Sequence, residues 1–476
     1  MRPTFYNNGP ARLLAAAIAV VLLTVPAGLR SEVPGPERDG AIKLSLEQAV
    51  KMAIESDELL RQAGEGVTGA KADVREARSG RLPSLTLSGY YGRNIRKPVL
   101  FLPSDMGDAF GGVTKIELGE DNDFSANAVL SYNLWTAGRV SAGIGATGAM
   151  LEAMRYQKTA TGEFVRFQVK KAYFDVLLAL ESLDIETKAL EATAEVLRVT
   201  KTGFDQGTVS RFDLLRAEVE MENRKPQLVS AENFVRQAMT ALRRRCGIDP
   251  DTPLELSDGL TAERLPGDLG QQIALMRSSS PEILALEQQI EAMRQNLRME
   301  KAERWPVLQL SANFLVQSQW SEDLFPESKA LARSSAVTLG FQIPIFDGFR
   351  AGARIDRANA ELRSARIELE RTGNEKEMAV RGAWLALESA LAALEGRRRT
   401  VELAEEAHRL AMVRLTNGLA TPVERLDAEL AMTAARAQLA QALYSCKMAR
   451  AQLELATGID TDGRPVTSYE RETGDE

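Results

Sequence analysis

The sequence predicts a mixed, mainly α-helical fold that is built from two tandem structural repeats and carries four β-strands of the transmembrane-barrel type. Three observations predict this fold class. Long tracts without proline place apolar residues at helical spacing, four short segments alternate apolar with polar residues, and the two halves of the chain resemble each other at a fixed offset.

The N-terminal segment 1–30 has the features of a secretory signal peptide. Arg2 and Arg12 precede a short apolar run over 13–25, which is followed by small residues. The run is shorter than the ~20 residues that a membrane helix needs, and a single-span anchor is the alternative interpretation. The sequence therefore predicts an exported protein.

Two tracts, 139–202 and 352–415, predict helices several times longer than the globular average of ~11–12 residues. Apolar residues in the first tract recur at three- and four-residue steps, as on one face of a helix. Shorter helices are predicted over 46–79, 211–246, 271–304 and 422–457.

Two glycines, Gly207 and Gly418, separate pairs of predicted helices. A glycine in this place is a common C-terminal stop, because it adopts a left-handed backbone without steric cost. The following residues are typical of a helix start: Ser210 with Asp213 three residues on, and Thr421 with Pro422 and Glu424. Each repeat is therefore predicted to hold an antiparallel helical hairpin with a tight turn.

Four segments of about ten residues alternate apolar with small polar residues, and several end in aromatic residues. This length and pattern are typical of tilted membrane strands with aromatic girdles, and half-buried strands of a soluble sandwich are the alternative. The predicted strands cover 83–95, 124–135, 307–319 and 335–346.

The chain repeats itself with one change of register. The segment 207–218 resembles 418–429 at an offset of 211 (418 − 207), whereas 81–87 resembles 304–310 at an offset of 223 (304 − 81). The first repeat therefore carries about twelve extra residues, which we expect in an exposed loop within 96–123. The predicted division is a signal peptide (1–30), a first repeat (41–250), a linker (251–265), a second repeat (266–460) and a disordered tail (461–476).

The four strands also predict an oligomer. Lipid tolerates no open sheet edge, because unpaired backbone N–H and C=O groups cost several kcal/mol each. The smallest membrane barrels have about eight strands, so one chain cannot close a barrel alone. Two copies would supply eight strands and three would supply twelve, and this argument does not fix the number.

Composition excludes several kinds of function. A net charge of −7 argues against nucleic-acid binding, and no phosphate loop, metal-ligand cluster or nucleophile motif predicts an enzyme or a cofactor. The single histidine, His408, is expected on a solvated helix surface. The two cysteines, Cys246 and Cys446, are expected as buried thiols without a bridge.

These features together resemble the TolC-like outer membrane efflux protein family over nearly all of 46–460. The resemblance rests on the order and doubling of short motifs: Leu46–Val50, Arg81–Ser84, Arg304–Pro306, Leu134–Arg139, Ile345–Arg350 and the two glycine turns. Members of this family are the outer membrane factors of tripartite efflux or type I secretion systems.

The resemblance implies a homotrimer in the outer membrane of a Gram-negative bacterium. Twelve strands would form one barrel in the lipid, continuous with an α-helical barrel across the periplasm. A periplasmic adaptor (membrane fusion) protein and an inner-membrane transporter would load this export duct. The alternatives are a periplasmic coiled-coil adaptor or scaffold without a membrane barrel, and a periplasmic enzyme with a helical stalk.

The resemblance also implies a periplasmic aperture, or gate, beside the glycine turns. Its acidic residues correspond to Glu424, Asp427 and Asp213 of this chain. In a trimer each would form a ring of three carboxylates, and such rings favour cations at a constriction. The alternative is that these carboxylates only stabilise the first turn of a helix.

The chain departs from the family where some members latch the closed gate with a tyrosine and an arginine. The comparable positions are Leu415 and Ala420. Arg414 and Arg425 could replace this latch by forming salt bridges to a neighbouring copy.

Overall fold

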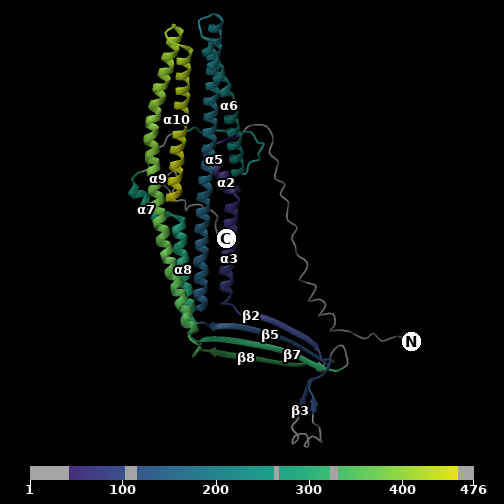
Figure 1. Cartoon of the computed structure of the whole chain (residues 1–476). Helices are drawn as coiled ribbons and strands as arrows, with labels where there is room; N and C mark the ends of the chain where they lie inside the picture. The colour runs from purple at the N-terminus through teal and green to yellow at the C-terminus, as the bar shows by residue number, and fades with distance from the viewer. Residues whose placement is uncertain (1–41, 102–114, 262–266, 322–330, 459–476) are drawn as a thin grey trace, which may run out of the picture. The chain divides into compact units, whose positions relative to one another are not determined.

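A computed structural model describes four stretches of the chain, which are residues 42–101, 115–261, 267–321 and 331–458 (Figure 1). The predicted signal peptide, the predicted tail and part of the predicted surface loop lie outside the described residues.

Two hairpins of long helices dominate the fold (Figure 1). The first joins α5 (Arg139–Asp205) to α6 (Arg211–Arg245), and the second joins α9 (Arg350–Thr416) to α10 (Pro422–Thr457). Both α5 and α9 have 67 residues, about 100 Å at ~1.5 Å per residue. The bounds agree with the predicted helices to within three residues.

The predicted helix over 46–79 is wrong in one respect, because it is broken. The structure has α2 (Leu46–Ser56) and α3 (Glu58–Ser79) on either side of Asp57. Asp57 has an extended backbone, and its carboxylate accepts hydrogen bonds from the N–H groups of Leu59 and Leu60. Aspartate is favoured as the N-cap of a new helix and is less favourable inside a continuous helix.

The predicted helix over 271–304 is broken in the same way. It consists of α7 (Leu269–Ser279) and α8 (Pro281–Ala302), and Ser280 between them is extended. Pro281 has no N–H to continue α7 but fits the first turn of α8.

Four antiparallel strands form the main sheet in the order β2-β5-β7-β8. They are β2 (Ser84–Arg93), β5 (Asn122–Trp135), β7 (Val307–Trp320) and β8 (Ala332–Gln342). The last strand was predicted to reach residue 346, but it ends before Pro344, which has no N–H for a sheet hydrogen bond. The two outer strands, β2 and β8, each have one neighbour in this sheet.

The strand register sorts the side chains onto two different faces, since directly paired residues share a face. One row joins Leu85, Leu130, Ala312 and Val337 across all four strands. The adjacent row on the opposite face consists of Ser84, Ser131, Ser311 and Thr338. The sheet therefore has an apolar face and a small, polar face.

Two short sheets were not predicted. Strand β1 (Ile42–Leu44) pairs in parallel with β6 (Leu254–Leu256), which lies inside the predicted linker. Strand β3 (Val99–Phe101) pairs with β4 (Lys115–Glu117) inside the predicted surface loop.

The core lies where α5 meets its neighbours near the middle of its length. Helix α5 packs against α3, α6, α8 and α10, and α10 also packs against α9. Tyr173 of α5 is fully buried, and its hydroxyl donates a hydrogen bond of 2.9 Å to Asp258, just after β6. Burial, together with the nearby Asp258 carboxylate, raises the pKa of Tyr173. The segment after β6 is thereby fixed against α5.

Element bounds recur at the two offsets found in the sequence. The first residue numbers of α9 and α5 differ by 211 (350 − 139), and those of α10 and α6 differ by the same amount (422 − 211). The first residue numbers of α8 and α3 differ by 223 (281 − 58). Positions that correspond in the two halves therefore occupy corresponding helices.

Candidate functional site

The turns of the two helical hairpins have the same backbone geometry. Gly207 and Gly418 lie in the left-handed region, with φ of 75° and 71°. Gly207 N–H donates to the Phe204 carbonyl, and the next N–H donates to the Gly203 carbonyl at 2.8 Å. The Gly418 turn repeats this pair of bonds, which is the Schellman arrangement that ends many helices.

The returning helices begin with side-chain caps. Ser210 Oγ accepts a hydrogen bond from the Asp213 N–H at 3.1 Å, and Thr421 Oγ1 accepts one from the Glu424 N–H at 3.2 Å. These contacts confirm the predicted helix starts at both turns. They also fix where the first-turn carboxylates of α6 and α10 lie.

Each of the three predicted gate carboxylates has a partner within the chain. Asp213 accepts a hydrogen bond of 2.6 Å from the Ser210 hydroxyl. Glu424 lies 3.9 Å from the guanidinium of Arg414, at the end of α9. Asp427 accepts a hydrogen bond of 2.8 Å from Arg216 of α6.

The contact between Arg216 and Asp427 joins the two hairpins close to their turns. The residue numbers differ by 211 (427 − 216), so the two residues hold corresponding places on α6 and α10. Sequence reasoning singled out Asp427 but missed Arg216. The duplication gives the two residues equivalent places, but only the packing of α6 beside α10 shows that they meet.

The structure also shows the positions of the two arginines near the predicted latch, Arg414 and Arg425. Arg414 donates a hydrogen bond of 3.2 Å to the Leu419 carbonyl, within its own turn. Arg425 is 6% exposed, on α10. Salt bridges from these arginines to a second copy remain a prediction.

His408 does not lie on a solvated surface, so that prediction is wrong. Its Nε2 is 2.7 Å from a carboxylate oxygen of Glu429, and the two side chains are 20% and 4% exposed. The atoms are close, although the contact lacks hydrogen-bond geometry. The pair joins α9 to α10, and packing of the two helices against each other covers most of the His408 side chain.

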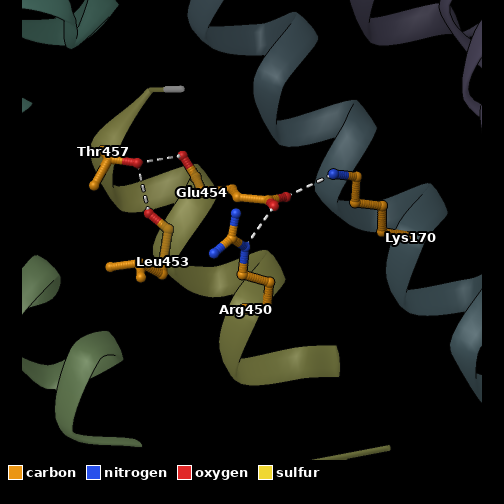
Figure 2. Close-up of polar contacts among 5 residues, drawn as sticks. All are labelled: Lys170, Arg450, Leu453, Glu454 and Thr457. Carbon is orange, nitrogen blue, oxygen red and sulfur yellow. Dashed lines mark hydrogen bonds and ion pairs between the residues drawn. The ribbon is translucent and has the colours of Figure 1, made fainter. Parts of the chain in front are cut away.

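A second link between the hairpins, drawn in Figure 2, lies near the middle of α5 and is almost buried. The Lys170 ammonium lies 2.6 Å from Glu454 of α10, whose other carboxylate oxygen accepts a hydrogen bond of 3.0 Å from Arg450. The Tyr444 hydroxyl donates a hydrogen bond of 2.7 Å to Asp175 of α5 nearby. Sequence reasoning did not single out these residues.

The described residues contain free thiols, but no metal-binding cluster and no helix that could span a membrane. Within them, no three His, Cys, Asp or Glu side chains are grouped so as to hold a metal ion. Both cysteines are free and buried, which confirms the prediction for them. Among the described helices, none combines the length and the apolar character needed to cross a membrane.

Comparison with known proteins assigns the family. The family model described as outer membrane efflux protein matches residues 49–247 and 273–459. Protein CyaE of Bordetella pertussis is 26% identical over 431 residues, which are 90% of this chain and 86% of that protein. The alkaline protease secretion protein AprF of Pseudomonas aeruginosa is 21% identical over 89% of this chain and 86% of its own length.

Solved structures share the fold. The CmeC outer membrane channel of Campylobacter jejuni superimposes with a TM-score of 0.73 at 18% identity, over 92% of this chain and 93% of that one. The family match covers both hairpins and the sheet strands between them. The chain therefore belongs to the outer membrane efflux protein family.

Proposed function

We propose that this protein is one subunit of a trimeric export duct in the outer membrane of a Gram-negative bacterium. The observation that carries the proposal is the four-stranded sheet. Among the described residues, no strand pairs with the outer edges of β2 and β8. One face of the sheet presents exposed apolar side chains, including Leu85 (72%), Val337 (75%) and Phe341 (77%). In water the open edges and apolar face of such a sheet would promote aggregation, whereas in lipid the sheet can form part of a closed barrel.

A second copy is the natural partner for each open edge. Because β2 and β8 are the two ends of one antiparallel sheet, β8 of one copy can pair with β2 of the next without reversing any strand. Three copies would then give the twelve strands that the family resemblance implies. Each unpaired backbone group that remained in lipid would instead cost several kcal/mol.

Uncovered helix faces support the same assembly. On α6, Phe212, Leu215 and Val219 are between 49% and 71% exposed, at the spacing of one helix face. Helix α9 exposes Leu385 and Leu403 to a similar degree. In an oligomer of this chain, these faces would cover each other and form the wall of a helical barrel across the periplasm.

The names of the relatives favour export as the task. One relative is an alkaline protease secretion protein, and a structural neighbour is an outer membrane channel. We propose that a periplasmic adaptor and an inner-membrane transporter load this duct at the hairpin turns. Asp213, Glu424 and Asp427 would then line the periplasmic aperture, close to Gly207 and Gly418.

Membrane extraction and conductance test the proposal. The mature chain should require detergent for release, migrate as a trimer in mild detergent, and form long-lived conducting pores in planar bilayers. A protein released from membranes without detergent, monomeric and without conductance, would contradict the duct and favour the coiled-coil adaptor.

A further inference from the structure

The ion pair between Arg216 and Asp427 has a consequence for the charge of the aperture. The Arg216 guanidinium lies 2.8 Å from Asp427 Oδ1, and both side chains are partly exposed, at 42% and 56%. The pair therefore meets solvent as a neutral unit. An unpaired Asp427 at the same place would present a full negative charge.

The other acidic residues at the turns do not have a comparable partner. Asp213 is held by the uncharged Ser210 hydroxyl. Glu424 is 3.9 Å from Arg414, whose guanidinium also donates to the Leu419 carbonyl at 3.2 Å. Among these carboxylates, only Asp427 makes a charge-assisted hydrogen bond of ordinary length to an arginine, and such bonds are about twice as strong as neutral ones.

We propose that Arg216 sets the ion selectivity of the aperture by masking the charge of Asp427. The inference rests on the proposed duct, because only in a closed ring of copies do the Asp427 carboxylates share one height along a pore. A ring of bare carboxylates concentrates cations and repels anions, whereas a ring of ion pairs does so weakly.

The position of the pair links this masking to the hairpins. Arg216 stands on α6 of the first hairpin, and Asp427 stands on α10 of the second. Any movement that separates α6 from α10 at the turns breaks the pair and uncovers the carboxylate.

Reversal potentials in planar bilayers under a salt gradient test the proposal. The assay uses potassium chloride near 0.1 M, where charges act over about 10 Å. Arg216→Gln removes the mask and should raise the permeability ratio of potassium to chloride by about threefold to fivefold. Arg216→Lys keeps a cation at this place and should stay close to the wild-type ratio.

A matched control lies on the same helix. Lys225 pairs with Glu222 at 2.6 Å and is 51% exposed, and neither residue belongs to the second hairpin. Lys225→Gln removes the same charge from each copy as Arg216→Gln does, yet it should leave the ratio unchanged. The control separates a local effect at the aperture from a change of net charge.

The double variant decides whether Asp427 is the group that is masked. Arg216→Gln combined with Asp427→Asn should return the ratio to near the wild-type value. The proposal is overturned if Arg216→Gln alone leaves the ratio unchanged, or if the double variant keeps the full increase. A wild-type protein that forms no pore would overturn the proposed duct instead, so the two failures are distinct.

Discussion

The ammonium of Lys170 lies 2.6 Å from the carboxylate of Glu454, and both side chains are almost buried, at 9% and 11% exposure. They join α5 of the first hairpin to α10 of the second, and Arg450 completes the group (Figure 2). The link near the turns, between Arg216 and Asp427, is 42% and 56% exposed. Solvent screens only the second link, so the two links should differ greatly in energy.

Removing one partner of the buried pair should destabilise the fold strongly. Glu454→Gln leaves the Lys170 ammonium buried without a counter-charge, which typically costs about 3–5 kcal/mol. Arg216→Ala breaks an exposed pair and should cost at most about 1 kcal/mol. Denaturant unfolding followed by circular dichroism would measure both changes, and equal losses in the two variants would contradict the assignment.

Gly207 and Gly418 should stabilise the hairpin turns through their left-handed backbone conformation and not through the space they leave for neighbouring atoms. A Cβ at Gly207 or Gly418 would meet no atom within 4 Å, but φ is positive at both. Alanine there should therefore cost about 1 kcal/mol through backbone strain. Gly373 also has open space but lies inside α9, so Gly373→Ala should stabilise the protein by about 0.5–1 kcal/mol. Thermal unfolding would measure the three melting temperatures, and an equal decrease in all three variants would refute this distinction.

Glu282, at the start of α8, should make stability depend on pH. Burial, the largest single influence, would raise the pKa of Glu282. The Lys376 ammonium at 2.5 Å, together with hydrogen bonds from the Glu282 backbone and the Ser280 hydroxyl, outweighs burial, so the pKa lies below the ordinary 4.5. The stabilisation is thus full above pH 4.5 and is lost as the pH falls through the lowered pKa. Melting temperatures of wild type and Glu282→Gln should differ at pH 7 and converge in acid. If the melting temperatures of the two proteins keep the same difference down to pH 3, the ion pair between Glu282 and Lys376 is contradicted.

The two thiols should be inert in the folded protein. Cys246 and Cys446 are each 2% exposed, and burial raises the pKa of Cys246 to about 11. Because only a thiolate reacts readily, iodoacetamide near neutral pH should modify neither residue until denaturant is added. Mass spectrometry would count the modified thiols, and rapid labelling of the native protein would disprove their burial.

Local sequence signals predicted much of this fold. Ser210 and Thr421 mark helix starts because a hydroxyl at that place satisfies free N–H groups, whatever the helices pack against. The break at Asp57 was missed because aspartate is tolerated inside a helix, and only the interruption there shows that it acts as a cap. The early end of β8 follows from Pro344, a local signal that the alternating pattern concealed.

Contacts between helices could not be predicted in the same way. His408 was assigned to the surface from its neighbours in sequence, but the rotation of α9 against α10 places it beside Glu429. The same limit applies to Lys170 and Glu454, which are far apart in the chain and carry no motif. Side-chain partners depend on how helices are rotated and aligned, and the apolar pattern alone leaves several alignments open.

Cross-linking between β2 and β8 of different copies tests the central claim most directly. Thr86 of β2 and Ala336 of β8 stand in one row of the sheet within a copy. The strands of a closed barrel are tilted and shifted in register, so the residue of β8 that faces a given residue of β2 in the next copy has to be found by a scan along both edges. Ser84→Cys, Thr86→Cys or Tyr90→Cys of β2 would be combined in turn with cysteine at every second residue of β8 from Ala332 to Gln342, with Cys246 and Cys446 replaced by alanine. The duct predicts that oxidation in the membrane gives covalent trimers for at least one combination and none for the single-cysteine variants. Monomers alone in every combination would contradict a barrel shared between copies.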